Sequence, residues 1–422
     1  MKIRYLLICF VVSLNMYPLC AQTKGVVVDA HTMLPLAGVN IYFQTDTMGL
    51  GITNSDGQFD LAMLKKRKDT DLVVFSYVGY RLQKLTVEQL RQGHYLVHLD
   101  EFVQNLDEVK VRGRHAPIEL EYFKLSSLPV PLYSFASFAS EGKLYVVAGD
   151  ETFVRPATGK FSQGTEAVEF RSSKMYIYDI ETDSWTVSRH KFVPRSCHKA
   201  HLYNNRAFIL GGKRYSTNRK IDYTDATMEV YDLIKDTVYV EPLNPHQAVN
   251  FTSVVYQDNL YLIGGSVKER VYADKVHALN LKTGHWYELG TIPEEMRREM
   301  NGFLVDNDIY FLGGRRSIAT DRTDRYNLLS GEWKQLANLP EEISYPALAT
   351  DGSFIYMYTS GKIYTYNIKT GFLERYYIAL NVVDPGLLYW SNKLYIIGGC
   401  MRPANYVFPL REVYVVDTSK MK

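Results

Sequence analysis

The stretch that decides the fold is Phe208–Gly212, which reads Phe-Ile-Leu-Gly-Gly, an apolar strand that ends in a pair of glycines. The same pattern returns at Tyr261–Gly265, Tyr310–Gly314 and Tyr395–Gly399, and Val146–Asp150 is a weaker copy. Paired glycines at a strand end let two backbones approach closely and adopt dihedral angles that are closed to other residues. The recurrence therefore predicts a chain built from copies of one β unit.

A second marker follows each copy and sets the period. After a variable loop comes a strand that ends in Asp or Asn, at positions 179, 232, 280, 327, 367 and 417, so that successive copies lie 40 to 53 residues apart. Six positions further on stand Trp185, Trp286 and Trp333, with Val238 and Leu373 in the same place. Periods of this length indicate the blades of a β-propeller, because one such sheet cannot bury its faces alone and must stack on its neighbours.

These features resemble Kelch repeats over residues 118–422, and the six copies predict a six-bladed propeller. A seventh blade would require a missed copy, for which the even gaps between the copies leave no room. The fifth copy, Phe354–Gly361, lacks the glycine pair. The sixth copy ends at Val413–Asp417 without an outer strand, whereas Tyr122–Pro129 repeats the spacing of Trp333–Pro340. We therefore expect the N-terminal segment to complete the last blade and close the ring, which would leave no exposed sheet edge there.

Ahead of the repeats, residues 22–100 are predicted to form a small β-sandwich. Asp56-Gly57 is a hairpin signal between Gly51–Thr53 and Phe59–Leu61, since glycine accepts a positive φ without steric cost. The other predicted strands are Gly25–Asp29, Gly38–Phe43 and Leu72–Tyr77. About 75 residues are enough for a modest two-sheet core without metal or disulfides.

This segment resembles the carboxypeptidase regulatory-like domain, in the motifs at Gly25–Asp29, Pro35–Asn40, Thr53–Phe59 and Phe75–Tyr80. The resemblance implies a transthyretin-like sandwich in a Gram-negative envelope protein. Leu106–Gly113, within an expected linker at 101–117, is similar to the segment that follows such domains in TonB-dependent outer-membrane receptors. Neither the plug nor the membrane barrel of those receptors follows, so uptake through a pore is not implied.

The first residues predict export. Lys2 and Arg4 precede an apolar run that ends at Leu14, and a small residue, Ala21, completes a secretory signal over residues 1–21. The run is too short to span a bilayer, and no later window reaches the roughly 20 apolar residues that a spanning helix needs. A lipid anchor at Cys20 is the alternative, although Leu19 is larger than lipobox-like sequences prefer. We expect the protein in the periplasm or at the outer-membrane surface.

Composition narrows the class of partner. The chain has 422 residues, is 46% hydrophobic and 22% charged, and has 48 basic against 46 acidic side chains. This balance argues against a nucleic acid partner, and the hydrophobic content excludes a disordered chain. Cys197 and Cys400 are the cysteines that remain after export, and we expect two independent thiols rather than a disulfide framework.

Charged side chains gather in the loops after the glycine pairs and at the starts of the innermost strands, which in Kelch rings share one face around the central channel. The five loops hold 16 basic and 11 acidic side chains. Several guanidinium groups that converge there would hold a carboxylate, sulfate or phosphate through paired hydrogen bonds. The candidate ligand-binding residues are Asp150, Arg195, His198, Arg297, Arg298, Glu299, Arg315, Arg316 and Arg402.

A structural reading competes with this hypothesis. An arginine near an inner-strand start satisfies loop carbonyls and nearby carboxylates, and Pro194-Arg195 fits the Pro-Arg that Kelch repeats often carry there. For any single arginine we favour the structural role. Tyr345 and Asp384 also start inner strands and are candidates to line the channel, although turn chemistry accounts equally well for Asp384.

Metal chemistry is not expected. Cys197 and His201 face one side of a predicted strand and His198 the other, and no second ligand group follows at a suitable spacing. The copper set of galactose oxidase, which shares Kelch-type blades, cannot be placed in this sequence. We therefore expect no metal and no cofactor, and recognise no hydrolase, zinc-protease or phosphate-loop motif.

Two functions remain. The first is an exported, non-catalytic binding protein of the envelope, whose propeller face recognises a glycan or a protein. The alternative is an enzyme that acts on an acidic sugar, similar to the exported six-bladed Kelch proteins that interconvert the anomers of sialic acid. Such an enzyme needs an acid and a base near the anomeric oxygen, and Glu299 or Asp150 beside an arginine would serve.

Overall fold

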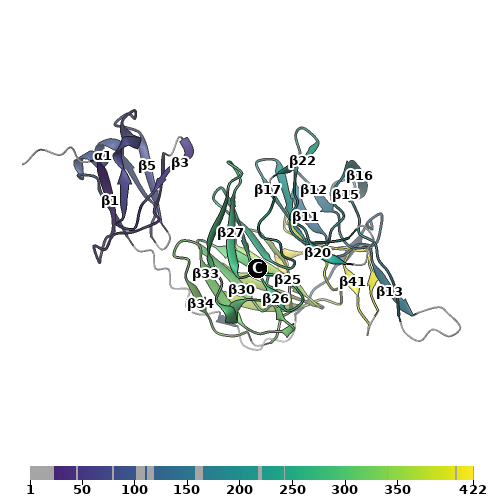
Figure 1. Ribbon diagram of the computed structural model, residues 1–422. Helices are drawn as coiled ribbons and strands as arrows, with labels where there is room; N and C mark the ends of the chain where they lie inside the picture. The colour runs from purple at the N-terminus through teal and green to yellow at the C-terminus, as the bar shows by residue number, and fades with distance from the viewer. Residues whose placement is uncertain are drawn as a thin grey trace, which may run out of the picture. The chain divides into compact units, whose positions relative to one another are not determined.

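The computed structural model describes residues 23–43, 46–77, 80–100, 110–111, 118–156, 165–216, 221–241, 243–339, 341–403 and 406–421. The expected signal segment and Cys20 lie outside these residues. The chain divides into two compact units, Met1–Val103 and Gln104–Lys422, and Figure 1 labels some of the strands of each. Both are built almost entirely from β-strands, which confirms the expected all-β class. No helix in the described part is long and apolar enough to cross a membrane.

The N-terminal unit contains two sheets, with strand orders β4-β1-β7 and β3-β2-β5-β6. Val27, Ile41, Phe43, Phe75 and Val97 are fully or almost fully buried in one core with α1 (Val87–Gln92), whose N-terminus has a capping box from Thr86. The strands are β1 (Lys24–Asp29), β2 (Asn40–Phe43), β3 (Asp46–Ile52), β4 (Gln58–Asp60), β5 (Leu72–Ser76), β6 (Gln83–Thr86) and β7 (Leu96–Leu99), with a 3-10 helix η1 at Leu61–Leu64.

The predicted hairpin around Gly57 is wrong, although its turn exists. Gly57 has a φ of +68°, but the two strands that it joins, β3 and β4, belong to different sheets. β4 pairs instead with β1, and the Phe59 ring lies over Gly25, where a side-chain carbon would come within 2.2 Å of a ring atom. Packing of Phe59 onto a bare backbone therefore outweighs the local preference of the turn for a hairpin.

Among the described residues, the C-terminal unit contains six sheets that each include four antiparallel strands, here called blades 1 to 6. From the inner strand outward, blade 1 is β11 (Ala136–Ser140), β12 (Lys143–Val147), β15 (Lys174–Asp179) and β16 (Ser184–Lys191); blade 2 is β17 (Lys199–Tyr203), β18 (Arg206–Leu210), β21 (Met228–Asp232) and β22 (Thr237–Glu241); blade 3 is β23 (Thr252–Tyr256), β24 (Asn259–Ile263), β27 (Lys275–Asn280) and β28 (Trp286–Thr291). Blade 4 is β29 (Gly302–Val305), β30 (Asp308–Leu312), β33 (Thr323–Asn327) and β34 (Trp333–Gln335), with η2 (Glu294–Met296) ahead of it; blade 5 is β35 (Ala347–Thr350), β36 (Phe354–Thr359), β37 (Lys362–Asn367) and β38 (Phe372–Tyr377); blade 6 is β39 (Gly386–Trp390), β40 (Lys393–Ile397), β43 (Val413–Asp417) and β10 (Phe123–Leu125), with η3 (Thr418–Met421) at its end.

Five blades also carry a two-stranded hairpin after their second strand, several of which are labelled in Figure 1. These hairpins are the variable loops that follow the glycine pairs in the sequence. They are β13 (Phe153–Pro156) with β14 (Thr165–Val168), β19 (Lys213–Tyr215) with β20 (Asp222–Thr224), β25 (Ser266–Lys268) with β26 (Val271–Tyr272), β31 (Arg315–Arg316) with β32 (Ile318–Ala319), and β41 (Cys400–Met401) with β42 (Phe408–Pro409).

The glycine pairs join one blade to the next. The amide of Gly212 donates to the Ala248 carbonyl of blade 3 at 3.0 Å, and a side chain at Gly212 would come within 2.4 Å of the Ser196 carbonyl oxygen. The corresponding glycines in the other blades make the same bond: Gly149 to Arg195, Gly265 to Arg298, Gly314 to Ile343 and Gly399 to Leu132, at 2.8 to 3.0 Å. Glycine is needed because the neighbouring backbone occupies the space of a Cβ.

Blade 5, which lacks the glycine pair, uses a side chain instead. The amide of Val382 donates to the Tyr358 hydroxyl at 3.0 Å, and this hydroxyl donates to the Leu380 carbonyl. A buried tyrosine thus takes over the blade-to-blade contact in the degenerate copy. Blade 5 is extended by two short parallel additions to β38, namely β8 (Lys110–Val111), from the expected linker, and β9 (Ile118–Glu119).

The N-terminal strand of the propeller pairs as predicted. β10 is antiparallel to β43, with Phe123 opposite Val415 and Leu125 opposite Val413. Tyr122 stands edge-on to Tyr414, with ring centroids 5.4 Å apart. Closure of the ring by this strand, and its contribution to folding, stay predictions.

Candidate functional site

The starts of all six inner strands surround a cavity of about 570 Å³. Its wall includes Ser134 from blade 1, Cys197 and Lys199 from blade 2, Asn250 from blade 3 and Asn301 from blade 4. Blades 5 and 6 add Tyr345 and Asp384, the two inner-strand residues that the sequence singled out as channel candidates. Cavities of this size accept a small molecule, and this one lies at the end of the strands where the variable hairpins begin.

Four blades present their wall residues through the same backbone distortion. Two positions before the inner strand, Ser134, Cys197, Asn250 and Asp384 have φ values of 49°, 56°, 52° and 51°. Asn and Asp adopt this left-handed conformation with little cost, whereas serine and cysteine do so rarely. Backbone hydrogen bonds connect neighbouring blades here. The Cys197 amide donates to the Ser134 carbonyl at 2.7 Å, and the Ser134 amide donates to the Asp384 backbone carbonyl at 3.2 Å.

Two of the predicted arginines line the cavity, each beside a carboxylate. Arg315 pairs with Glu299 at 2.6 Å, and Glu299 also accepts a hydrogen bond from the Asn250 amide at 3.2 Å. Arg402 pairs with Asp384 at 2.6 Å. Both arginine side chains are partly exposed, at 44% and 42%, so they remain accessible to a ligand while their charges are balanced.

Asp150, another predicted residue, lines the cavity from the end of the first repeat. It accepts the Thr152 amide at 2.9 Å, and the Arg171 guanidinium lies 3.6 Å away. Arg171 itself forms a two-pronged pair with Asp222, which also binds the lining residue Lys213 at 2.7 Å. Lys213 is thus a cation of the wall that already has a carboxylate partner.

Lys199 is a wall residue that the sequence candidates do not include. Its ammonium lies 3.4 Å from the Asn301 amide oxygen and 5.2 Å from the centre of the Tyr345 ring. Burial lowers the pKa of Lys199 to about 8. Strand alternation could have found it, because Lys199 lies between Cys197 and His201 in register, on the side of the strand that the sequence assigned to both.

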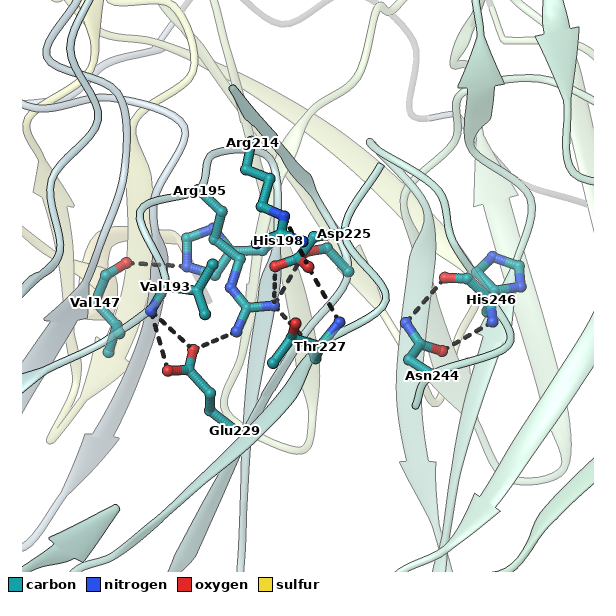
Figure 2. Close-up of polar contacts among 11 residues, drawn as sticks. Val147, Val193, Arg195, His198, Arg214, Asp225, Thr227, Glu229, Asn244 and His246 are labelled. Atoms are coloured by element: carbon teal, nitrogen blue, oxygen red, sulfur yellow. Dashed lines mark hydrogen bonds and ion pairs between the residues drawn. The ribbon is translucent and has the colours of Figure 1, made fainter. Parts of the chain in front are cut away.

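Arg195 and Arg298 lie in the framework between blades. Arg195 is fully buried, pairs with Glu229, lies 3.2 Å from Asp225, and donates to the Thr227 carbonyl at 2.7 Å, as Figure 2 shows. Arg298 is 2% exposed and pairs with Asp324 at 2.6 Å. Neither lines the cavity, so the six predicted arginines do not all come together in its wall.

The framework role has a recurring geometry. Arg195, Arg298 and, in blade 3, His246 each reach the carbonyl of the first glycine of their blade's pair: Gly211 at 3.4 Å, Gly313 at 2.8 Å and Gly264 at 3.0 Å. Figure 2 shows His246 held by Asn244, which accepts the His246 amide at 2.8 Å. A long donor at this place satisfies a carbonyl that the turn would otherwise leave unpaired.

The remaining candidates lie at the border. Arg297 donates to the Ile292 carbonyl at 2.8 Å and Arg316 contacts the Glu294 carbonyl at 3.5 Å, and neither lines the cavity. His198 lines it in part, but its ring bonds to the Val147 carbonyl at 3.0 Å, and burial and the Arg195 charge lower its pKa. Its imidazole is therefore a neutral structural group.

Among the described residues, no group of three or more His, Cys, Asp or Glu side chains comes together in a way that could hold a metal ion. His201 instead bonds to the Ser253 hydroxyl at 2.6 Å, and burial lowers its pKa to about 3. Cys197 and Cys400 are both free thiols, as expected.

The class that these features define is a β-propeller with a polar axial cavity, and the comparisons with known proteins agree. The family model described as the KLHDC2/KLHL20/DRC7 Kelch-repeats domain matches residues 136–360, more than half of the chain. This chain belongs to the Kelch-repeat family. A CarboxypepD_reg-like domain matches residues 23–111, so both resemblances noted in the sequence are confirmed.

One similar solved structure shows the fold alone, because its sequence identity is low. The solved structure titled "Structure of YjhT" aligns with a TM-score of 0.55 at 13% identity, over 68% of this chain and 95% of that one. No curated protein matches the chain. The Kelch propeller fold suggests a binding or interaction role, and the axial cavity is where the polar side chains for such a role come together.

Proposed function

We propose that this protein is an exported sugar-binding module whose ligand occupies the axial cavity. The observation that carries the proposal is a cavity of about 570 Å³ whose wall combines ion pairs, hydroxyls and amides from all six blades. A volume of this order suits a small molecule, while many donors and acceptors around it suit a polyhydroxylated ligand. A protein partner would instead be recognised on an open surface of larger area.

Export is part of the proposal and is supported by the sequence. The basic start, the short apolar run and Ala21 are typical of a secretory signal. The carboxypeptidase regulatory-like unit is expected to hold or dock the propeller within the envelope, in the periplasm or at the outer-membrane surface. Fractionation of cells that express the full chain tests this part, and retention in the cytoplasm would refute it.

The sugar site is tested by filling the cavity. Ser344 lines it, so Ser344→Trp should abolish binding in calorimetric titrations with a panel of neutral and acidic monosaccharides. Ser330→Trp, on an exposed turn of blade 4, is the matched control and should bind like the parent. Sugar binding that survives Ser344→Trp would place the ligand elsewhere, and a panel without any binder would refute the proposed function.

A second candidate is the interconversion of sugar anomers, favoured by the position of two carboxylates. Glu299 and Asp150 both line the cavity, with guanidinium groups 2.6 and 3.6 Å away. Proton transfer to and from the ring and anomeric oxygens is the chemistry that such a group performs. NMR exchange spectroscopy with N-acetylneuraminate would measure it. A rate equal to that of buffer removes this candidate, and a rate enhancement lost in Glu299→Gln supports it.

A further inference from the structure

The wall of the axial cavity has one cation more than it has carboxylates. The lining residues include four cationic side chains, Lys199, Lys213, Arg315 and Arg402, and three carboxylates, Asp150, Glu299 and Asp384. Arg315 and Arg402 are paired with carboxylates of the wall, and Lys213 with Asp222 behind it. Among the described residues, Lys199 forms no ion pair with a carboxylate. The excess positive charge is therefore localised on a single ammonium group.

The surroundings of this ammonium are neutral and aromatic. Asn301 accepts a hydrogen bond from it at 3.4 Å, and the Tyr345 ring lies 5.2 Å away. Asn301 is itself anchored, since its amide donates to the Pro346 carbonyl at 3.0 Å, and the Tyr345 hydroxyl donates to the Phe251 carbonyl at 3.1 Å. Lys199 thus lies in a fixed setting with donor capacity left over, because an ammonium has three N–H groups.

We propose that Lys199 is the specificity-determining residue of the axial cavity, where its ammonium binds the carboxylate of an acidic sugar. This inference rests on the proposed sugar-binding function and adds the charge of the ligand to it. A single negative charge fits a site with one uncompensated cation. A phosphate, with close to two charges, would leave a negative excess near the wall carboxylates.

Binding should be linked to the protonation of Lys199. The titratable and charged side chains that line the cavity together with Lys199 are Tyr133, Asp150, Cys197, His198, His201, Lys213, Glu299, Arg315, Tyr345, Tyr358, Asp384 and Arg402. Burial lowers the pKa of His198 and His201 and raises that of Cys197, Tyr133, Tyr345 and Tyr358. The pKa of Lys199, about 8, lies between the lowered pKa values of the two histidines and the raised pKa values of the cysteine and the tyrosines. Affinity for an acid should thus fall as pH rises above about 8, by up to about tenfold per unit.

The experiment compares acidic sugars with neutral counterparts in the full chain. Dissociation constants of N-acetylneuraminate, glucuronate and galacturonate are measured beside those of N-acetylmannosamine, glucose and galactose, from pH 6.5 to about 9.5. Three variants accompany the parent. Lys199→Met removes the charge at similar length, Lys199→Arg keeps a charge that does not titrate, and Lys268→Met, on the exposed strand β25 outside the cavity wall, is the control.

The expected result has three parts. In the parent and in Lys268→Met at least one acid binds more tightly than its neutral counterpart. Lys199→Met loses about tenfold to one hundredfold in affinity for that acid alone, the range for a hydrogen bond to a charged group. Lys199→Arg keeps the preference but shows a flat pH profile, which a merely structural lysine would not produce. Circular dichroism confirms that each variant is folded.

Two outcomes would refute the role of Lys199 and leave the proposed sugar-binding function standing. If neutral and acidic sugars bind the parent with equal dissociation constants, the sugar site does not discriminate between ligands by their charge. A preference for acids that survives in Lys199→Met with its pH profile intact would assign that preference to another residue. If none of the six sugars binds the parent, the proposed function falls, and the role of Lys199 falls with it.

Discussion

Arg195 and Lys199 are four residues apart and show two opposite uses of a positive charge. Arg195 is completely buried between blades and is compensated by Asp225 and Glu229, so its charge is satisfied within the protein. Lys199 reaches the axial cavity, where a neutral amide and an aromatic ring are its neighbours. The difference teaches that basic residues at the starts of inner strands serve both the framework and the site, and that complete burial beside two carboxylates marks Arg195 as a framework residue.

The largest effect should come from removing β10, the outermost strand of blade 6, which pairs with β43. Deletion of residues 120–129 removes β10, the strand that pairs with β43, and exposes the edge of blade 6. We expect loss of cooperative unfolding, measured by circular dichroism during a urea titration. A deletion variant that unfolds at the same urea concentration as the parent would refute closure of the propeller by this strand.

Next in size is the loss of the buried guanidinium. Arg195→Met leaves the buried Glu229 without its cation and Asp225 with Arg214 alone, 3.5 Å away, and breaking such a buried pair typically costs about 3–5 kcal/mol. The free energy of unfolding from urea titrations measures it. Arg315→Met is the matched control, because its pair with Glu299 is partly exposed and such pairs contribute about 0–1 kcal/mol. Equal effects in both variants would contradict the division between framework and site.

Glu341 is an intermediate case, a carboxylate with 27% of its side chain exposed. Burial by itself would raise its pKa, but hydrogen bonds from its neighbours prevail and lower the pKa to about 2. The donors are Lys362, Tyr364 and Arg375.

Because the folded pKa of Glu341 lies below the value of 4.5 for a free side chain, its stabilisation is present above pH 4.5 and is lost as pH falls toward 2. Glu341→Gln should therefore lower the free energy of unfolding at neutral pH by on the order of 2 kcal/mol and weaken its dependence on acid. The exposed neighbour Glu342→Gln is the control and should follow the parent at every pH. A Glu341→Gln profile parallel to that of the parent would contradict this assignment.

An effect of the same order as that at Glu341 is expected at Lys199. Its folded pKa of about 8 lies below the free value of 10.5, so the unfolded chain binds more protons between these pH values. Stability of the parent should therefore rise with pH across this window, by on the order of 2 kcal/mol, and Lys199→Met should lack the rise. Thermal unfolding of both proteins between pH 7 and about 10 measures it. A rise of equal size in Lys199→Met would assign the titration to another group.

The sequence predicted the repeats well because their signals are local. Gly211 and Gly212 mark a strand end whatever lies beside it, and the blades form where the period placed them. The turn at Gly57 was also local and was found, but the pairing of the strands around it was predicted wrongly. The pairing of β4 with β1 depends on where the Phe59 ring is buried. This ring packs over Gly25, which is far away in the chain.

The candidate site shows the same division. Alternation along a strand was enough to place Cys197 and His201 on one side, and Lys199 could have been found in this way. The sequence pattern could not identify the carboxylate partners of Arg195 and Arg298. These partners, Glu229 and Asp324, are 34 and 26 residues away in the chain. Residue type alone does not reveal whether a cation is already compensated.

What the amino-acid order by itself determined is the unit of construction: a strand, a glycine pair and a loop, repeated until the sheets close-pack. These properties follow from backbone sterics and the two-residue period of strands, which act over a few neighbours. Only the tertiary structure decided that Lys199 is the uncompensated cation of the axial cavity. Electrostatic compensation depends on distances through space, and six separate segments of the chain have to meet before any of those distances exists.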